Sequence, residues 1–191
     1  MRIIAGTYRS RKLEAPPGMN TRPTSDRLRE TLFNVLAPRI SGAAFLDLYA
    51  GSGAVGIEAI SRGAGRVAFV ERDPAALRVL RGNLERLGIA QGFRIHAGSV
   101  KVFLQKRHLN AGPKPERYEV VFLDPPYEAT EEYAATLGVL GGLASSYLAT
   151  GGLVVAEHRR KQILDERYGG LRRTRRLEQS DAALSFYSSG G

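Results

Sequence analysis

Short apolar runs alternate with amphipathic segments along most of this chain. The runs predict five strands, at 44–49, 66–71, 93–96, 118–123 and 152–157. The run from Tyr118 to Leu123 carries large apolar residues at successive positions, which is typical of a parallel strand that is buried on both faces. The pattern therefore indicates a parallel sheet as the centre of the fold.

The amphipathic segments between these runs predict helices. They are expected from Asp26 to Pro38, from a glycine-rich turn to about Ser61, from Asp73 to Gly88, for a short stretch after Val100, and from Thr130 to Leu140. For the first helix, Ser25 or Thr24 is the expected N-cap and Pro38 is expected to end the helix. Strands and helices that alternate with right-handed crossovers predict an α/β fold with a doubly wound, Rossmann-like parallel sheet.

The two ends of the chain have a different pattern. Leu171–Leu177 and Ala183–Tyr187 predict two strands joined by a polar turn, which would form a terminal antiparallel hairpin at the sheet edge. Residues 2–15 predict a small N-terminal β-hairpin, which is too short to fold alone. We therefore expect an N-terminal extension over residues 1–24 and one domain over residues 25–191.

Composition excludes several classes of protein. The chain has 191 residues and no cysteine, so it can form neither a disulfide nor a thiolate metal site. His96, His108 and His158 are far apart in sequence, and we assign no metal. No apolar run is long enough for a membrane span, and the first residues lack the pattern of a signal peptide. We expect a cytoplasmic protein.

The net charge of +9 is concentrated in two flanks. Residues 1–39 carry eight Lys/Arg against three Asp/Glu, and residues 158–177 carry eight against two. Such flanks favour a polyanion such as nucleic acid, although a solvated arginine-rich surface would give the same counts. Cations beside a tyrosine suit looped RNA, although a merely structural hairpin is an equal alternative. The candidate RNA contacts are Arg2, Tyr8, Arg9, Arg11, Lys12 and Arg22. We expect the hairpin to contribute to RNA affinity and not to cofactor affinity.

A glycine-rich turn follows the first strand. Gly51, Gly53 and Gly56 form a G-x-G-x-x-G pattern between a strand and a helix, where glycine permits a tight turn and the close approach of a ligand. Glu71 ends the next strand, at the position where a carboxylate holds the ribose hydroxyls of a dinucleotide. The pattern alone is weak, since many glycine-rich turns bind no ligand.

A second polar turn ends the strand at Leu123. In Asp124-Pro125-Pro126-Tyr127, the prolines stiffen the backbone, and the Asp124 side chain and Pro125 carbonyl supply two hydrogen-bond acceptors. Two acceptors beside an aromatic ring suit a planar group that carries an NH2. Asp-Pro and Pro-Pro are also common in ordinary turns between a strand and a helix.

Together these motifs resemble a known family. Asp47 to Gly53, Glu71 and Asp124 to Tyr127, on successive strand ends, are similar to the motifs of class I S-adenosylmethionine-dependent amino-methyltransferases. Arg2 to Gly6 and Thr21 to Glu30 resemble the bacterial 16S ribosomal RNA (guanine-N2) methyltransferases, the RsmD-like family. The resemblance extends from residue 2 to the Leu184-Ser185-Phe186-Tyr187 ending.

The resemblance implies S-adenosylmethionine as the cofactor and 16S ribosomal RNA as the partner, free or within an assembling or assembled small subunit. It places Asp47, Tyr49, Gly51, Gly53, Glu71, Arg72, Ser99 and Val100 at the cofactor, with Asp47 and the glycine loop on its amino-acid end and Glu71 on its ribose. Asp124, Pro125, Pro126 and Tyr127 would bind the target amine. Ser99 stands where the family usually has an acidic residue, so its hydroxyl or the Val100 backbone would meet the adenine. Nothing in the sequence requires more than a monomer.

Three alternatives remain open at this point. An amino-methyltransferase could act on adenine N6 of nucleic acid or on a protein glutamine, because either amine satisfies the same two acceptors. A nicotinamide-dependent oxidoreductase would use the glycine turn and Glu71 but gives no role to Asp124. A non-catalytic RNA-binding module would use the basic flanks and leaves both turns unexplained.

Overall fold

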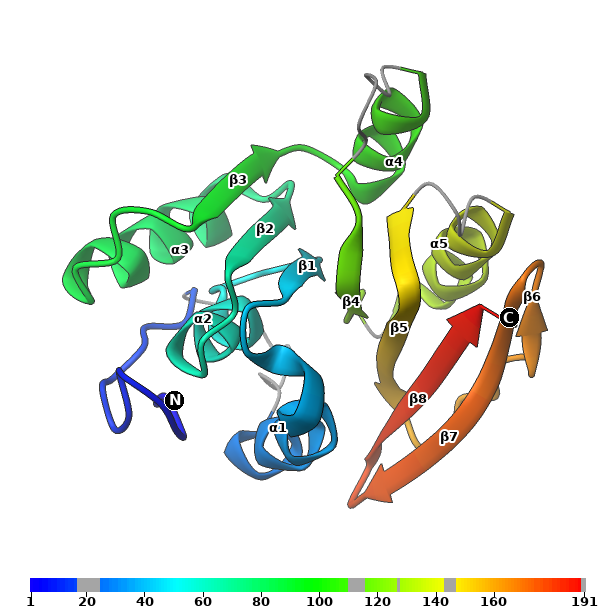
Figure 1. Cartoon of the computed structure of the whole chain (residues 1–191), viewed down its shortest axis with the longest axis horizontal. Helices are drawn as coiled ribbons and strands as arrows, with labels where there is room; N and C mark the ends of the chain where they lie inside the picture. The colour runs from blue at the N-terminus through cyan, green and yellow to red at the C-terminus, as the bar shows by residue number, and fades with distance from the viewer. Residues whose placement is uncertain (17–24, 110–115, 127, 143–146, 190–191) are drawn as a thin grey trace.

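The computed structural model describes residues 1–16, 25–109, 116–126, 128–142 and 147–189. Its centre is an eight-stranded sheet with helices on both faces, in the strand order β3-β2-β1-β4-β5-β8-β7-β6 (Figure 1). The strands are β1 Ala44–Leu48, β2 Arg66–Glu71, β3 Phe93–Ala97, β4 Tyr118–Leu123, β5 Leu148–Arg159, β6 Arg167–Tyr168, β7 Leu171–Gln179 and β8 Ala182–Ser189. The helices are α1 Asp26–Ile40, α2 Ala54–Ser61, α3 Pro74–Arg86, α4 Val100–Leu109 and α5 Thr130–Gly142.

Strands β1 to β5 are parallel, and β8 adds to β5 in the antiparallel direction. The chain builds β1, β2 and β3 outward in one direction and then returns to place β4 on the other side of β1. This return makes the carboxyl ends of β1 and β4 the topological switch point, where α/β sheets bind their ligands. The predicted parallel sheet with a terminal antiparallel hairpin is confirmed.

Alternate side chains of each central strand face opposite helical layers. Phe45, Phe69 and Phe122 pack in one buried cluster with α1, α2 and α3. Leu46, Val70 and Val121 belong to a second cluster with α4 and α5. Two buried faces explain why these strands are apolar at consecutive positions.

The element boundaries follow local chemistry, with two exceptions. Ser25, one of the two caps that the sequence offers, caps α1 by accepting a hydrogen bond from Leu28 N at 3.1 Å. The expectation that Pro38 ends this helix is wrong, because α1 continues to Ile40 with Pro38 in its last turn. The two-residue strand β6 was not predicted, since a pair of residues carries no periodicity.

The N-terminal segment, residues 1–16, turns back on itself without forming a regular ladder. Its only bridge among the described residues joins Arg2 to Lys12, and Ile3 N donates to Arg11 O at 3.0 Å. Ile3 and Leu13 are buried in the same cluster as α1 and α2. The segment therefore packs as part of the domain surface. The predicted boundary between an N-terminal extension and the domain at residue 24 stays a prediction. Among the described helices, none is long and apolar enough to cross a membrane.

Candidate active site

A cavity of about 390 Å³ lies at the carboxyl ends of the central parallel strands. It is lined by the ends of β1, β2 and β4, by the turns that follow them, and by the first residues of α4. Of the candidate residues, the lining contains Asp47, Tyr49, Gly51, Glu71, Arg72, Ser99, Val100, Asp124, Pro125 and Pro126. Residues from three strand ends that are far apart in sequence thus meet in one space.

Gly53 does not line the cavity but shapes the turn beside it. It is the N-cap of α2 with a φ of 79°, and a Cβ at this position would lie 2.2 Å from Leu80 Cδ1 on α3. Glycine is therefore required both by the left-handed backbone and by the close packing of α3. The structure shows a role of Gly53 in loop geometry, and its predicted contact with the cofactor stays a prediction.

Two carboxylates hold the glycine loop through its backbone. Glu71 Oε2 accepts a hydrogen bond from Gly51 N at 2.7 Å, and Asp47 Oδ2 accepts one from Gly56 N at 2.9 Å. The other oxygen of Glu71 accepts from Arg72 N at 2.7 Å and Asp73 N at 2.8 Å. Glu71 therefore fixes its own turn and the glycine loop before any ligand is present.

Burial changes the acidity of Asp47. Its side chain is only 2% exposed, and this desolvation raises its pKa to about 7. The hydrogen bond from Gly56 N opposes the rise in pKa, and the nearby charge of Glu71 adds to it. Asp47 is thus an acid that a neighbouring cation would ionise at neutral pH.

Tyr49 connects the cavity to α5. Its φ is 63°, in the left-handed region that non-glycine residues rarely occupy. Its hydroxyl donates to Glu132 Oε2 at 2.9 Å and lies 2.7 Å from Thr136 Oγ1. Burial raises the pKa of Tyr49 and the Glu132 carboxylate raises it further, so the phenol stays protonated.

The turn after β4 forms another part of the cavity wall. Asp124 is half-buried, Pro125 is buried and Pro126 is exposed. The carbonyl of Pro126 accepts a hydrogen bond from Ala129 N at 2.8 Å, which ties the turn to the start of α5. Tyr127, the predicted stacking ring, lies outside the described residues.

The turn after β3 leads directly into α4. The Ser99 hydroxyl accepts a hydrogen bond from Val102 N at 3.3 Å and so caps the helix. The backbone N–H groups of the first helical turn, beginning at Val100, have no acceptor within their own helix. Val102 N and Phe103 N donate to Ser99, so the N–H groups of Val100 and Lys101 are the donors that this wall offers to a ligand.

Sequence patterns missed several residues of the lining. Met1, Ala15 and Pro16 come from the N-terminal segment, and Glu132 comes from α5. The segment thus reaches the cavity, and the expectation that the hairpin contributes to RNA affinity and not to cofactor affinity stays a prediction. No periodicity signals such contacts, since they depend on how the segment docks against the domain. Lys101 and Asp73 also line the cavity, and their adjacency to Val100 and Glu71 could have revealed them.

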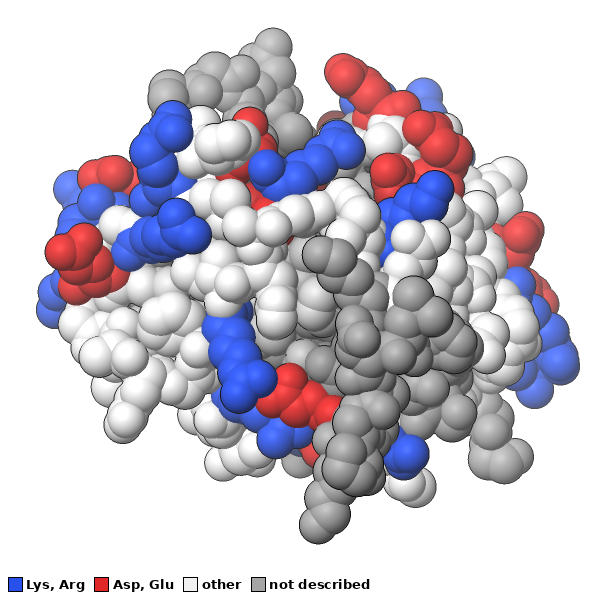
Figure 2. Space-filling model, turned by 90° about the horizontal axis from the view of Figure 1, so that it is seen from above, with Lys and Arg blue, Asp and Glu red and all other residues white. Residues whose placement is uncertain are grey.

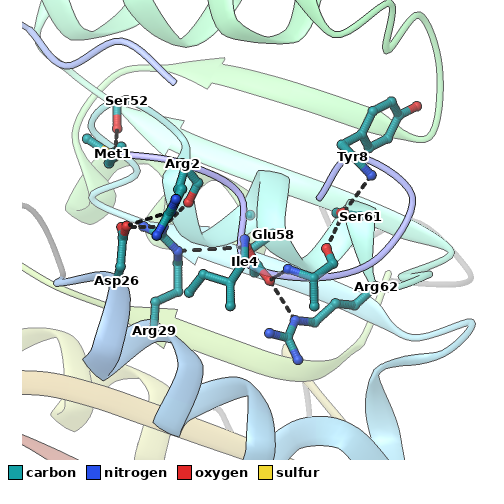
Figure 3. A network of polar contacts seen from close by, with 12 residues as sticks. Met1, Arg2, Ile4, Tyr8, Asp26, Arg29, Ser52, Glu58, Ser61 and Arg62 are labelled. Atoms are coloured by element: carbon teal, nitrogen blue, oxygen red, sulfur yellow. Dashed lines mark hydrogen bonds and ion pairs between the residues drawn. The ribbon is translucent and has the colours of Figure 1, made fainter. Parts of the chain in front are cut away.

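A buried polar network docks the N-terminal segment on α2 (Figure 3). Glu58 is fully buried, and its carboxylate accepts hydrogen bonds from Ile4 N at 2.8 Å, Ala5 N at 3.0 Å and Arg62 Nε at 2.7 Å. The equally buried Arg29 lies with its Nε 3.8 Å from Glu58 Oε2. These hydrogen bonds attach the N-terminal segment to α2.

The candidate RNA contacts lie on the outside of this segment. Arg2, Arg9, Arg11 and Lys12 are exposed, whereas Tyr8 is partly buried and packs against the core. Tyr8 is thus less open to stacking than its sequence context predicts, and Arg22 lies outside the described residues. Figure 2 shows Lys and Arg in separate groups on the face it presents, interleaved with Asp and Glu. On that face, charge is distributed in patches and does not form one continuous surface.

Comparison with known proteins gives the family. The sequence model of the family described as "Conserved hypothetical protein 95" matches residues 1–188. The chain belongs to this family. It is 36% identical to the protein YlbH of Bacillus subtilis over 194 residues, which covers all of both chains. The family resemblance drawn from the motifs is confirmed.

Further relatives agree with this assignment. The chain is 42% identical to ribosomal RNA small subunit methyltransferase D of Escherichia coli over 127 residues, which span 66% of this chain and 60% of that protein. A solved structure of a hypothetical protein from Thermus thermophilus is 37% identical, covers 97% of this chain and 98% of its own, and has a TM-score of 0.80. The fold is that of class I methyltransferases.

The raised pKa of Asp47 predicts a specific dependence of stability on pH. Because the folded state disfavours ionisation of Asp47, this group lowers the free energy of unfolding as pH rises from about 4, its unfolded pKa, to about 7. Asp47→Asn removes this ionisation, so the variant should gain stability relative to the wild type over that range, by a few kcal/mol. Urea unfolding of both proteins at pH 5 and pH 8 measures it. Parallel pH profiles would contradict the buried-acid assignment.

Proposed function

We propose that this protein transfers a methyl group from S-adenosylmethionine to the exocyclic N2 amine of a guanine in small-subunit (16S) ribosomal RNA. The observation that carries the proposal is the meeting of Asp124 and Pro125 with Glu71 and the glycine loop in one cavity. This meeting supports a turn that would bind an amine beside a loop that would bind a nucleotide. The relative from Escherichia coli is named as a ribosomal RNA small subunit methyltransferase, which supports the substrate class.

The cavity fits the cofactor in size and in chemistry. Its volume of about 390 Å³ lies in the usual range for small-molecule sites. Asp47 and the Gly51 loop face the amino-acid end of the cofactor, whose ammonium would favour the ionised form of Asp47. Glu71 keeps one lone pair, on Oε2, for a ribose hydroxyl, because Gly51 N, Arg72 N and Asp73 N occupy the other three. When bound, the cofactor supplies an electrophilic methyl group on a sulfonium.

The adenine end would lie at the turn after β3. The Val100 N–H at the start of α4 would donate to an adenine ring nitrogen. The Ser99 hydroxyl accepts from Val102 N and keeps a second lone pair for the adenine amine, so both contacts that the sequence leaves open are compatible with this turn. The Arg72 side chain is exposed and covers the outer side of the site.

The turn at Asp124 activates the target amine by orientation and charge. The lone pair of a guanine N2 amine is delocalised into the ring, which makes it a poor nucleophile. Asp124 and the Pro125 carbonyl each accept one N–H, which directs the remaining lone pair toward the methyl group. As the N–C bond forms and the C–S bond breaks, the Asp124 carboxylate stabilises the positive charge that develops on nitrogen. The amine proton is then released toward Asp124.

The first test concerns the ribose contact. Glu71→Ala should weaken S-adenosylmethionine binding at least about tenfold, because a hydrogen bond to a charged acceptor contributes about 1.5–3 kcal/mol. Isothermal titration calorimetry gives the affinity, with Glu85→Ala, an exposed change on α3, as the control. Equal affinity in Glu71→Ala and wild type would rule out the assignment of Glu71.

The second test concerns the chemical step. Asp124→Ala should lower turnover at least about a hundredfold, or about 3 kcal/mol, while cofactor affinity changes far less. Asp124→Asn keeps an acceptor without the charge and should fall in between. Glu128→Ala, an exposed change in the same turn, is the control.

The product identifies the target atom. Nuclease digestion and mass spectrometry of small-subunit ribosomal RNA methylated in vitro should show N2-methylguanosine. N6-methyladenosine in its place would overturn the guanine assignment and leave the role of Asp124 intact.

The third test concerns RNA contact by the N-terminal segment. Replacing Arg9 and Lys12 with alanine should weaken RNA binding and flatten its dependence on salt, by about 1.4–1.8 in log–log slope for two phosphate contacts. The matched control removes the same charge from α3, with Arg78→Ala and Arg81→Ala. Filter binding over a range of salt concentrations measures both. Identical slopes in the two double variants would show that the segment has a structural role only.

A further inference from the structure

Asn83 is a buried amide whose hydrogen-bonding capacity is fully used. Its side chain is 0% exposed. Its Oδ1 accepts from Glu14 N at 2.9 Å and from Arg86 Nη2 at 2.6 Å. Its Nδ2 donates to Glu14 O at 3.1 Å and to Ser52 O at 2.9 Å. Two accepted and two donated bonds are the maximum for a carboxamide, and the partners determine which way it points.

These four bonds join three separate parts of the chain. Glu14 belongs to the N-terminal segment, Ser52 lies in the glycine loop, and Asn83 itself is on α3. Ser52 also lines the cavity, and so do Ala15 and Pro16, which directly follow Glu14. Asn83 thus joins two parts of the chain that line the cavity.

The N-terminal segment is attached to the domain at its other end as well. Glu58 holds Ile4 and Ala5, and the Ser61 hydroxyl donates to Ala5 O and accepts from Tyr8 N at 3.0 Å. Its exposed cations at Arg9 and Lys12 lie between these attachments and Glu14. The loop that carries Arg9 and Lys12 is therefore attached to α2 before it and to Asn83 after it. A change in the position of this loop would reach the cavity lining through Asn83.

We propose that Asn83 is a positioning residue that couples RNA contact by the N-terminal segment to cofactor binding at the glycine loop. The inference rests on the proposed function, since it requires S-adenosylmethionine in the cavity and RNA on the segment. RNA on Arg9 and Lys12 holds the segment in place, Asn83 passes this constraint to Ser52, and the cavity binds the cofactor more tightly. The coupling is reciprocal, so bound cofactor strengthens RNA binding by the same factor.

The experiment measures cofactor affinity with and without RNA. Calorimetric dissociation constants for S-adenosylmethionine are determined for wild type and Asn83→Ala, alone and with saturating small-subunit ribosomal RNA. In wild type, RNA should tighten cofactor binding about fivefold or more. In Asn83→Ala, cofactor affinity without RNA should fall about tenfold, and the effect of RNA should fall to nearly none.

Two further variants separate positioning from folding. Glu14→Ala removes only the exposed ion pair with Arg86 and keeps both backbone bonds to Asn83, so it should retain the full effect of RNA. Glu14→Pro removes the backbone N–H that donates to Asn83 Oδ1 and leaves the Asn83 side chain in place. It should therefore lose the effect of RNA on cofactor affinity, and it tests the coupling even if Asn83→Ala fails to fold.

The outcomes distinguish this inference from the proposed function. If wild type binds S-adenosylmethionine and RNA but RNA changes cofactor affinity equally in wild type and Glu14→Pro, the coupling role of Asn83 is wrong and the methyltransferase proposal stands. If wild type shows no effect of RNA, the coupling is equally excluded. If wild type does not bind S-adenosylmethionine at all, the proposed function itself fails.

Discussion

The fold depends on two carboxylates that hold a glycine loop by its backbone. Gly51 donates to Glu71 and Gly56 donates to Asp47, so the loop is fastened to β2 at one end and to β1 at the other. This arrangement places the start of α2, allows α3 to pack within van der Waals reach of Gly53, and leaves the carboxyl ends of β1 and β4 open as a cavity. Asp47 is buried for this purpose at the cost of a strongly raised pKa.

A second set of buried charges integrates the N-terminal segment. Arg29 and Glu58 are both fully buried, and burial of charge is unfavourable unless its hydrogen bonds are satisfied. The segment supplies partners to both groups, because Ile4 N and Ala5 N donate to Glu58 and Arg29 Nη2 donates to the carbonyl of Arg2. Arg29 Nε and Nη1 have no hydrogen-bond partner among the residues that the structure describes. The bonds to buried groups of the domain explain why a stretch too short to fold alone has a defined position.

Much of this architecture could be predicted from local patterns. The runs at β2 and β4 gave correct strand ends because a strand buried on both faces is apolar throughout, and Ser25 was recognised as a cap from its side chain. Contacts between distant parts of the chain had no such signal. Asn83 is one polar residue on an amphipathic helix, and only the docked position of Glu14 shows its use. The sequence could predict that Asp47, Glu71 and Asp124 lie near one another, because parallel topology brings the carboxyl ends of strands to one edge of the sheet. It could not predict that residues 15 and 16 line the same cavity.

The outer edge of the antiparallel hairpin has a consequence for the behaviour of the protein at high concentration. Strand β7 carries arginines at 172, 173, 175 and 176, and its register shifts between Arg173 and Arg175. Of the strands that the structure describes, only the two-residue strand β6 pairs with its far side. A long, flat and uncharged edge would invite strand addition by a second molecule. Positive charge, an irregular register and a short cover make such edge-to-edge association unfavourable at this side of the sheet.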